Sequence, residues 1–476
     1  MTMARTALLL SLLLSPGLAR AGAGADRPNI LLIAIDTCRA DHLSAYGYAR
    51  ATTPNIDALA RRGVLFESAY SQSNWTLPSF ASFLTGKYPR SLGMFNEGKR
   101  LSDFDYTDPK LGADETTLPE ALKKAGYRTA GFFTGRYNGP DYGFDQGFDL
   151  YRDYRSDVSR KQQRTDSFAA FLPEALEWME KNKDGPFFII LNPFELHRPY
   201  LPPAEFISPY AGDYKGVLAS TWFSKPVLSS IKKNGEGWSF SLDEATAAAG
   251  ALRKAKQFPS NYPPVRLDRA DLDYITARYD ASLTYVDKFI GELAAWAGKH
   301  TPGDTIIIIT GDHGEELGDH GGFLHNTDPP KLYQELIHVP LIMDIPAKWL
   351  NTGAAVVRQP VELVDLMPTI LDLAGASPPP GLQGRSLAGL LKGEKKEEGG
   401  RAVFAETRGY GVRVRSVKAG AWKLIRTGPR KGAPQKAELY DLASDPAEAH
   451  DLAGQEPDRV RELLHRLDAW SDKNGK

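Results

Sequence analysis

Four polar residues, far apart along the chain, have side chains suited to metal binding and ester chemistry: Asp36, Thr76, Asp312 and His313. Two carboxylates, one imidazole and one hydroxyl oxygen can together bind a single divalent cation. The hydroxyl of Thr76 has two interpretations on residue type alone. It is either an ordinary helix cap or a nucleophile that develops negative charge during a reaction.

The two aspartates each follow a continuous apolar run. Asp36 closes "NILLIAID", which begins at Asn29, and Asp312 closes "DTIIIITGD", which begins at Asp304. Such runs are typical of strands buried on both faces of a parallel sheet. Ligands of open parallel sheets bind beyond the carboxyl ends of the strands, so both acids are expected at one binding edge.

Thr76 lies in "SNWTLPSFASFLTG", a polar loop followed by small and apolar residues. Pro78 stands where the first turn of a helix is expected, because proline has no N–H to contribute to the ladder. This spacing predicts that Thr76 lies just outside the helix, beside its positive end.

The remaining pattern alternates strands with helices. The segment "TTPNIDALARRG" has Pro54 at a helix start and Gly63 at its stop. Alternation of this kind predicts a doubly wound α/β sheet with helices on both faces. Further strands are expected at 128–134, 186–192 and 339–345, and a long helix is expected with Ile275, Tyr279, Val286, Ile290 and Leu293 on one face.

The chain divides into a signal segment, a large domain and a small one. Residues 1–25 combine Arg5, an apolar run and small residues, which predicts a signal peptide and an exported protein, periplasmic or secreted. We expect a catalytic α/β domain over 26–391, with an excursion at 204–264, and a charged linker over 392–400. An α+β subdomain over 401–476 follows, because alternating strand patterns precede a final helix.

The composition argues against a nucleic-acid partner, a membrane span and a disulfide. The chain has 476 residues, 42% of them hydrophobic, and a formal net charge of -1. The absence of a basic excess argues against nucleic acid as a partner, and no later segment approaches the length of a membrane span. The single cysteine, Cys38, excludes an intrachain disulfide and is expected to be a buried apolar residue.

Several separated motifs occur together: "PNILLIAIDTCRADHLSAYGY", "TTPNIDALARRGVLFESAYSQS", the segment around Thr76, "GDHGEELGDHGG" and "ELYDLASDPAEAHDL". In this order they resemble the sulfatase family of the alkaline phosphatase superfamily over nearly the whole chain after residue 25. The resemblance implies an alkaline-phosphatase-like mixed sheet, an ester hydrolase activity, and Thr76 at the nucleophile position.

The resemblance also shows departures. The family motif C/S-x-P-S-R-x-x-x-x-T-G stands here as "TLPSFASFLTG", with Phe80 in place of arginine. Thr37 stands where many sulfatases have a second aspartate, and His313 where many have asparagine. Sulfatases use formylglycine made from cysteine or serine, which threonine cannot yield. The set of Asp36, Thr76, Asp312 and His313 resembles that of the phosphodiesterase and phosphonate monoesterase relatives in this superfamily.

These departures favour a metal-dependent hydrolase of phosphate or phosphonate esters that forms a covalent intermediate on Thr76. Three alternatives remain: a sulfuric ester hydrolase that works without formylglycine, a transferase of the phospho group, and an inactive homologue that binds anions. The imidazole ligand favours zinc or manganese, while the carboxylates leave calcium and magnesium open. The substrate is expected to be a small-molecule, glycan or lipid ester.

Other residues are assigned by their family positions. His197, in "NPFELHRPYLPP", and His325, in "GGFLHN", are expected to contact the substrate and to protonate the leaving alcohol. Arg136, in "TGRYNG", is expected to bind the anion. Apart from the family, structural roles are expected for three more residues: Arg39 and Asp41 brace the metal loop as a charge pair, and His320 shapes its own loop.

Overall fold

The computed structural model describes the chain over most of its length. The described residues are 27–95, 109–154, 167–219, 228, 230–235, 237–240, 264–325, 327, 329–350, 355–393, 400–409, 411–429 and 434–475. The predicted signal peptide, residues 394–399 of the predicted linker and most of the 220–263 part of the excursion lie outside them. No described helix is both long enough and apolar enough to cross a membrane.

An eight-stranded mixed sheet forms the centre of the molecule. Strands β1, β10, β6, β4 and β5 run parallel, whereas β12 runs antiparallel to both of its neighbours. In spatial order the strands are β13 (Ala355–Val357), β2 (Val64–Phe66), β12 (Leu341–Asp344), β10 (Thr305–Gly311), β1 (Asn29–Ile35), β6 (Phe187–Asn192), β4 (Arg128–Phe133) and β5 (Leu150–Asp153).

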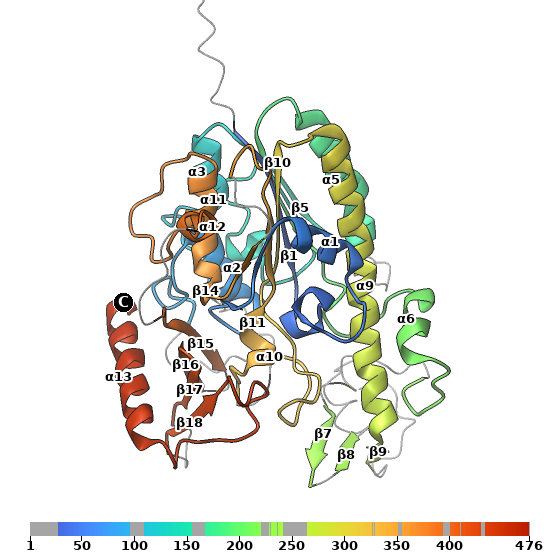
Figure 1. Cartoon of the computed structure of the whole chain (residues 1–476), viewed down its shortest axis with the longest axis vertical. Helices are drawn as coiled ribbons and strands as arrows, with labels where there is room; N and C mark the ends of the chain where they lie inside the picture. The colour runs from blue at the N-terminus through green and yellow to red at the C-terminus, as the bar shows by residue number, and fades with distance from the viewer. Residues whose placement is uncertain are drawn as a thin grey trace, which may run out of the picture.

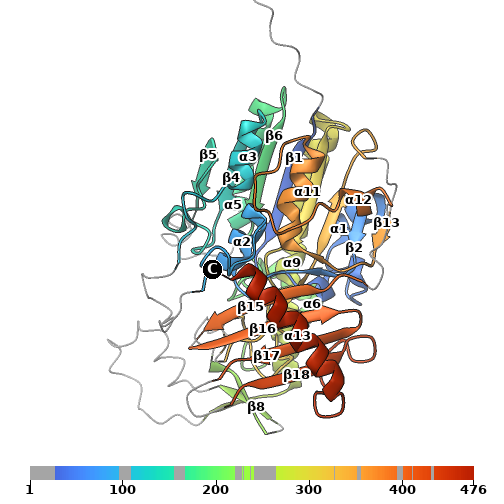
Figure 2. The same cartoon turned by 90° about the vertical axis from the view of Figure 1, so that its left-hand side faces the viewer.

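Helices cover both faces of this sheet, as Figures 1 and 2 show for α3 and α11 on one side and α5 and α9 on the other. The first face carries α1 (Pro54–Arg62), α5 (Ser167–Asn182) and α9 (Arg269–His300), and the second carries α2 (Thr76–Thr85), α3 (Leu118–Lys124) and α11 (Leu366–Leu373). The predicted doubly wound architecture is confirmed.

Strand β1 lies between two hydrophobic cores, which explains why its sequence is apolar throughout. Leu31, Ile33 and Ile35 pack into the core under α1, α5 and α9. Ile30 and Leu32 pack into the opposite core, under α2, α3 and α11. Successive side chains point to opposite faces of a strand, so a strand covered on both sides needs apolar residues at every position.

The segment 339–345 is predicted as one strand, but in the structure it contains parts of two. Pro340 separates β11 (His338–Val339) from β12, because proline cannot donate to a strand ladder. Strand β11 joins β3 (Ala69–Tyr70) and β14 (Val361–Glu362) in a small sheet beside the large one. The segment therefore contributes an inner strand to the large sheet and an edge strand to the small one.

The C-terminal part forms an antiparallel sheet of β15 (Val403–Gly409), β16 (Val412–Ala419), β17 (Trp422–Thr427) and β18 (Lys436–Asp441), covered by helix α13 (Pro457–Asn474). Val417 and Leu424 pack with Leu467 and Trp470 under that helix. Buried Arg401 ties the start of this sheet to Glu362 and Asp365 of the large domain.

Shorter elements complete the described chain. They are the 3-10 turns Ala40–His42, Ser44–Tyr46, Pro140–Tyr142 and Leu363–Asp365, helices α6 (Ala204–Ala211), α10 (Gln334–Ile337) and α12 (Ala388–Leu391), and strands β7 (Lys232–Asn234), β8 (Gly237–Phe240) and β9 (Val265–Leu267).

Candidate active site

The fold brings three of the four predicted metal ligands together. One potential ligand atom from each of Asp36, Asp312 and His313 lies within 4.8 Å of the others, and all three residues are buried. Asp36 directly follows β1, and Asp312 and His313 directly follow β10. These strands are adjacent and parallel, with Ile35 beside Gly311, so their carboxyl ends coincide.

The backbone around the acids fixes one oxygen of Asp312. The N–H groups of Thr37 and His313 donate to its Oδ1 at 3.1 and 2.8 Å. Thr37 adopts a φ of 57°, in the left-handed region, where the chain turns after β1. Thr37 therefore serves the loop through its backbone.

The remaining carboxylate oxygens suit a cation. Oδ2 of Asp312 and both oxygens of Asp36 are buried and accept no hydrogen bond of ordinary geometry from the described residues, although the Thr76 hydroxyl is close enough to Asp36 to lower its pKa. Buried carboxylates are costly unless a partner compensates their charge. Burial raises the pKa of Asp36 well above its ordinary value, and the charges of Asp312 and Glu315 raise it further. The donor set thus fits a divalent ion.

Thr76 lies at the first residue of helix α2, so the expectation that it would lie outside the helix is wrong by one position. The helix starts before Pro78 because the first residues of a helix need no intrahelical N–H bond. The Oγ1 of Thr76 lies 3.4 Å from Nε2 of His313. Thr76 thus joins the cluster, beside the positive end of the helix dipole.

His313 has a defined orientation. Its Nδ1 lies 2.8 Å from the carbonyl oxygen of Gly314, which can only accept a hydrogen bond. Nδ1 therefore carries a proton, and Nε2 is directed toward Thr76 and Asp312. A ring nitrogen at this place can bind a cation or take part in a hydrogen bond.

The predicted leaving-group histidines form a row that ends at His313. The ring centroid of His325 lies 4.5 Å from that of His313 and 5.3 Å from that of His197. His325 is buried, and its Nδ1 lies 3.1 Å from Oε2 of Glu315. His197 is partly exposed and stacks on Phe194 at 4.1 Å.

Arg136 differs from the members of this cluster in its burial. Its side chain is exposed, and its guanidinium lies 5.6 Å from the centre of the Tyr137 ring. Tyr137 in turn meets Trp75, the residue before Thr76. Anion binding by Arg136 stays a prediction.

Sequence reasoning missed two charged residues at the site, Glu315 and Arg198. Both are buried, and Arg198 is close enough to Glu315 and Asp36 to lower the pKa of each. Burial is the larger effect on Glu315 and raises its pKa to about 8. For Glu315 the sequence did offer a signal, because it is an acidic residue two positions after the predicted ligand His313.

Phe80 explains the departure from the family motif. Its side chain is fully buried and contacts Phe83, Phe133 and Phe144 in the core on the α2 side of the sheet. Position 80 therefore contributes apolar packing. Among the described residues, Arg198 is a buried cation that acts on the acids of the site.

The predicted bracing residues occupy the expected places. Arg39 donates to both carboxylate oxygens of Asp41, at 2.9 and 2.7 Å, and also to Asp319. His320 lies 2.7 Å from Glu335 and stacks on a tyrosine ring. Cys38 is fully buried, and burial raises the pKa of its thiol above the ordinary range.

Two family models match the sequence of this chain. The sulfatase family model matches residues 28–376. A second model, described as N-sulphoglucosamine sulphohydrolase, C-terminal, matches residues 318–472. The chain is 26% identical to an N-acetylglucosamine-6-O-sulfatase of Bacteroides thetaiotaomicron, over 93% of this chain and 86% of that protein.

Solved structures confirm the fold. A phosphonate monoester hydrolase of Agrobacterium radiobacter has a TM-score of 0.68 and 22% identity, covering 94% of this chain and 96% of that chain. A protein in complex with its substrate D-glucosamine-2-N,6-O-disulfate has a TM-score of 0.69 and 22% identity, covering 94% of this chain and 98% of that chain.

Proposed function

This chain belongs to the sulfatase family, and from that premise we propose that it is a metal-dependent hydrolase of sulfate esters that uses Thr76 as its nucleophile. The observation that carries the proposal is the position of the Thr76 hydroxyl, 3.4 Å from Nε2 of His313 within the acidic cluster. A hydroxyl in this place can become an attacking oxygen.

The comparisons change the order of preference among substrates. Sequence reasoning placed phosphate and phosphonate esters before sulfate esters, because threonine cannot yield formylglycine. The curated relatives are mostly sulfatases, including the Bacteroides enzyme and arylsulfatases K of mouse and chicken. A sugar or other small alcohol bearing a sulfate group is therefore our first candidate substrate.

Asp36, Asp312 and His313 would hold the cation, with Thr76 beside it. When bound, a divalent cation lowers the pKa of a neighbouring hydroxyl and neutralises charge on the oxygens of the transferred group. The unpartnered oxygens of Asp36 and Asp312 support such an ion. The imidazole nitrogen favours zinc or manganese, with calcium or magnesium as alternatives.

The reaction then needs two displacements. The Thr76 hydroxyl first gives its proton to water, and its Oγ1 then attacks sulfur. The bond from sulfur to the alcohol oxygen breaks, and His325 or His197 gives a proton to that oxygen. Water next attacks sulfur of the threonine sulfate, and the same imidazole accepts one proton of the water. The bond from sulfur to Oγ1 breaks, which releases sulfate and leaves Oγ1 of Thr76 deprotonated for the next cycle or reprotonated by water.

One observation favours a second function, the hydrolysis of phosphodiesters or phosphonate monoesters. The nucleophile position holds threonine, and water can hydrolyse a phosphothreonine at a cationic centre without formylglycine chemistry. The same site could also pass its phospho group to an alcohol, or bind anions without turnover. These two outcomes are separated by the assay below.

The test compares kcat/KM of the metal-loaded protein on an aryl sulfate, a sulfated monosaccharide, an aryl phosphodiester and an aryl phosphonate monoester. Thr76→Ala serves as the matched control, because a contaminating enzyme would keep its activity in that preparation. Preference for a sulfate ester supports the first proposal, and preference for a phosphodiester or phosphonate supports the second. Products formed with an added alcohol would reveal transfer.

If neither Thr76→Ala nor Asp312→Ala changes turnover or metal content, the proposed enzyme is excluded, and anion binding alone remains. Export of the protein belongs to the same proposal. It rests on the signal-like sequence at residues 1–25 and is tested by fractionation of cells that express the full chain.

A further inference from the structure

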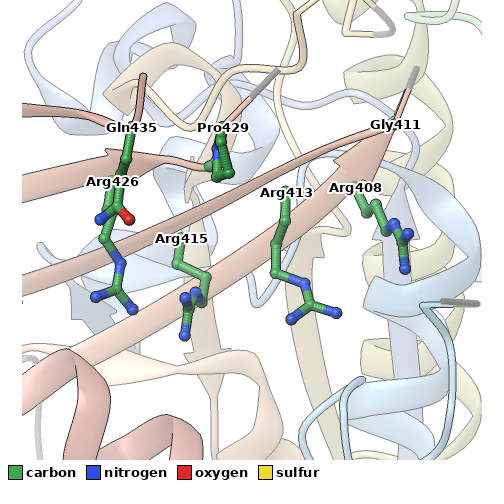
Figure 3. A pocket seen from close by; sticks show the side chains of 8 residues that line it. Arg408, Gly411, Arg413, Arg415, Arg426, Pro429 and Gln435 are labelled. Carbon is green, nitrogen blue, oxygen red and sulfur yellow. The ribbon is translucent and has the colours of Figure 1, made fainter. Parts of the chain in front are cut away.

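An arginine-lined cavity lies on the C-terminal sheet, among strands β15, β16 and β17. The cavity has a volume of about 440 Å³. Figure 3 shows four arginine side chains leaving the strands toward the same side. The cavity is lined by Arg408, Arg413, Arg415 and Arg426, together with Gln435 and the backbone near Gly428.

The strand register places these cations side by side. Arg408 lies opposite Arg413 in the pairing of β15 with β16, and Arg415 lies opposite Arg426 in the pairing of β16 with β17. Like charges directly opposite each other destabilise a sheet. Burial, and then the charge of Arg426, lower the pKa of Arg415 to about 10. The sheet therefore carries an electrostatic cost here that an anion would relieve.

Local acids compensate only part of this charge among the described residues. Glu406 pairs with both Arg413 and Arg90, and Asp468 pairs with Arg426. Arg415 donates to Ser471, which is neutral. Within the part of the chain that the structure describes, the group combines five guanidinium groups with two carboxylates.

Some N–H donors of these arginines are also unused within the described part of the chain. Nη1 of Arg408 and Nε of Arg426 are buried and have no hydrogen-bond partner among the described residues. Guanidinium groups bind sulfate, phosphate and carboxylate oxygens through paired N–H donors. Both atoms belong to side chains that line the cavity.

We propose that this cavity is an anion-binding subsite that holds a second sulfate group of a polyanionic saccharide substrate. The shape supports it, because 440 Å³ exceeds the size of one sulfate group and leaves room for the attached sugar. The substrate part of this inference rests on the proposed function. Binding of a sulfated saccharide does not depend on turnover and can be measured separately.

Two contacts connect the subsite with the catalytic loops. The N–H of Glu406 donates to the carbonyl oxygen of Gln72, four residues before Thr76. Gly409, next to Arg408, lies against Pro330, in the segment that follows His325. A saccharide held by these arginines is therefore anchored on the strand that borders both loops.

The binding experiment uses the whole metal-loaded protein and a sulfated oligosaccharide, with titration calorimetry as the readout. Arg408→Gln is the main variant, because Arg408 lacks the contacts with α13 that Arg415 and Arg426 make. Arg269→Gln is the matched control, since that arginine is exposed and lies on α9. We expect Arg408→Gln to weaken binding about tenfold and Arg269→Gln to leave it unchanged.

Inorganic sulfate provides the second arm. If the oligosaccharide binds no more tightly than inorganic sulfate, or if Arg408→Gln binds it like the wild type, the inference is overturned. Thermal melting of each variant verifies folding, and Arg413→Lys, which keeps the charge, provides a second test. Lysine lacks the planar fork of donors, so weaker binding in that variant is also expected.

The catalytic arm separates this inference from the proposed function. We expect Arg408→Gln to raise KM about tenfold for a polysulfated saccharide and to leave KM for a monosulfated aryl ester unchanged. Equal effects on both substrates would overturn the subsite. If the wild-type protein turns over neither substrate, the proposed function is contradicted, while the binding experiment still tests the subsite.

Discussion

The Thr76 hydroxyl lies 3.4 Å from Nε2 of His313, although 237 positions of sequence separate the two residues. Helix α2 delivers the first residue and the end of strand β10 delivers the second. His313 turns its Nδ1–H toward the carbonyl oxygen of Gly314, so its Nε2 points into the site. A nucleophile and a ligand nitrogen therefore share one buried cluster of acids.

Thr76→Ala is expected to lower kcat at least about a thousandfold, because it removes the only oxygen at that position that can form the covalent bond. Thr76→Ser keeps the hydroxyl and should retain measurable activity. Steady-state kinetics on the preferred ester provide the measurement. Activity of Thr76→Ala within tenfold of wild type would contradict the role of Thr76.

Removal of the metal is expected to lower both activity and melting temperature, because the buried charges of Asp36 and Asp312 then lack compensation. Dialysis against a chelator followed by calorimetry measures the change. In Asp36→Asn, addition of the metal should raise the melting temperature less than in wild type. An equal rise in the two proteins would show that the ion binds elsewhere.

His325→Gln tests proton donation to the leaving group. The expected loss is about a hundredfold for an alkyl ester, whose alcohol needs a proton, and only a few-fold for a nitrophenyl ester. Exposed His450 offers a matched control as His450→Gln. Equal losses on the two esters would assign His325 a positioning role beside Glu315 and His313.

The sequence allowed the large domain to be predicted because its strands are buried on both faces. Runs such as 29–35 and 305–311 are apolar at every position, and the helices between them carry strong start and stop residues. Segment 339–345 was harder to predict, since one proline divides its pairing between two sheets. The antiparallel direction of β12 depends on tertiary contacts that apolar patterning does not encode.

The candidate site was predictable only in part, for a physical reason. Asp36, Asp312 and His313 follow strands, and strand ends in a parallel sheet converge. Arg198 and Glu315 follow no such rule, because their position depends on how loops fold over the site. A charged side chain in a loop is exposed by default, so burial of these two residues becomes visible only in the structure.

Asp287 gives a pH-dependent prediction away from the site. This residue of α9 accepts hydrogen bonds from the N–H groups of Asn55 and Ile56, at the start of α1. Burial raises its pKa to about 6. The folded state therefore binds a proton more tightly than the unfolded state, and the contribution of Asp287 to the free energy of unfolding falls as pH rises from about 4 to about 6.

Urea unfolding across that pH range measures the effect. Asp287→Asn should remove a slope of up to about 1.4 kcal/mol per pH unit. Asp273→Asn, on an exposed part of the same helix, is the control. If the wild type and Asp287→Asn show the same slope, Asp287 is ionised throughout the range and the predicted pKa direction is wrong.

The most direct test of the account is rapid acid quenching during turnover of the preferred ester, followed by peptide mass spectrometry. We expect a sulfate or phosphate adduct on Thr76, formed as fast as the first equivalent of alcohol is released. A burst of alcohol release with an unmodified Thr76, or with the adduct on another residue, would contradict a covalent role for this threonine.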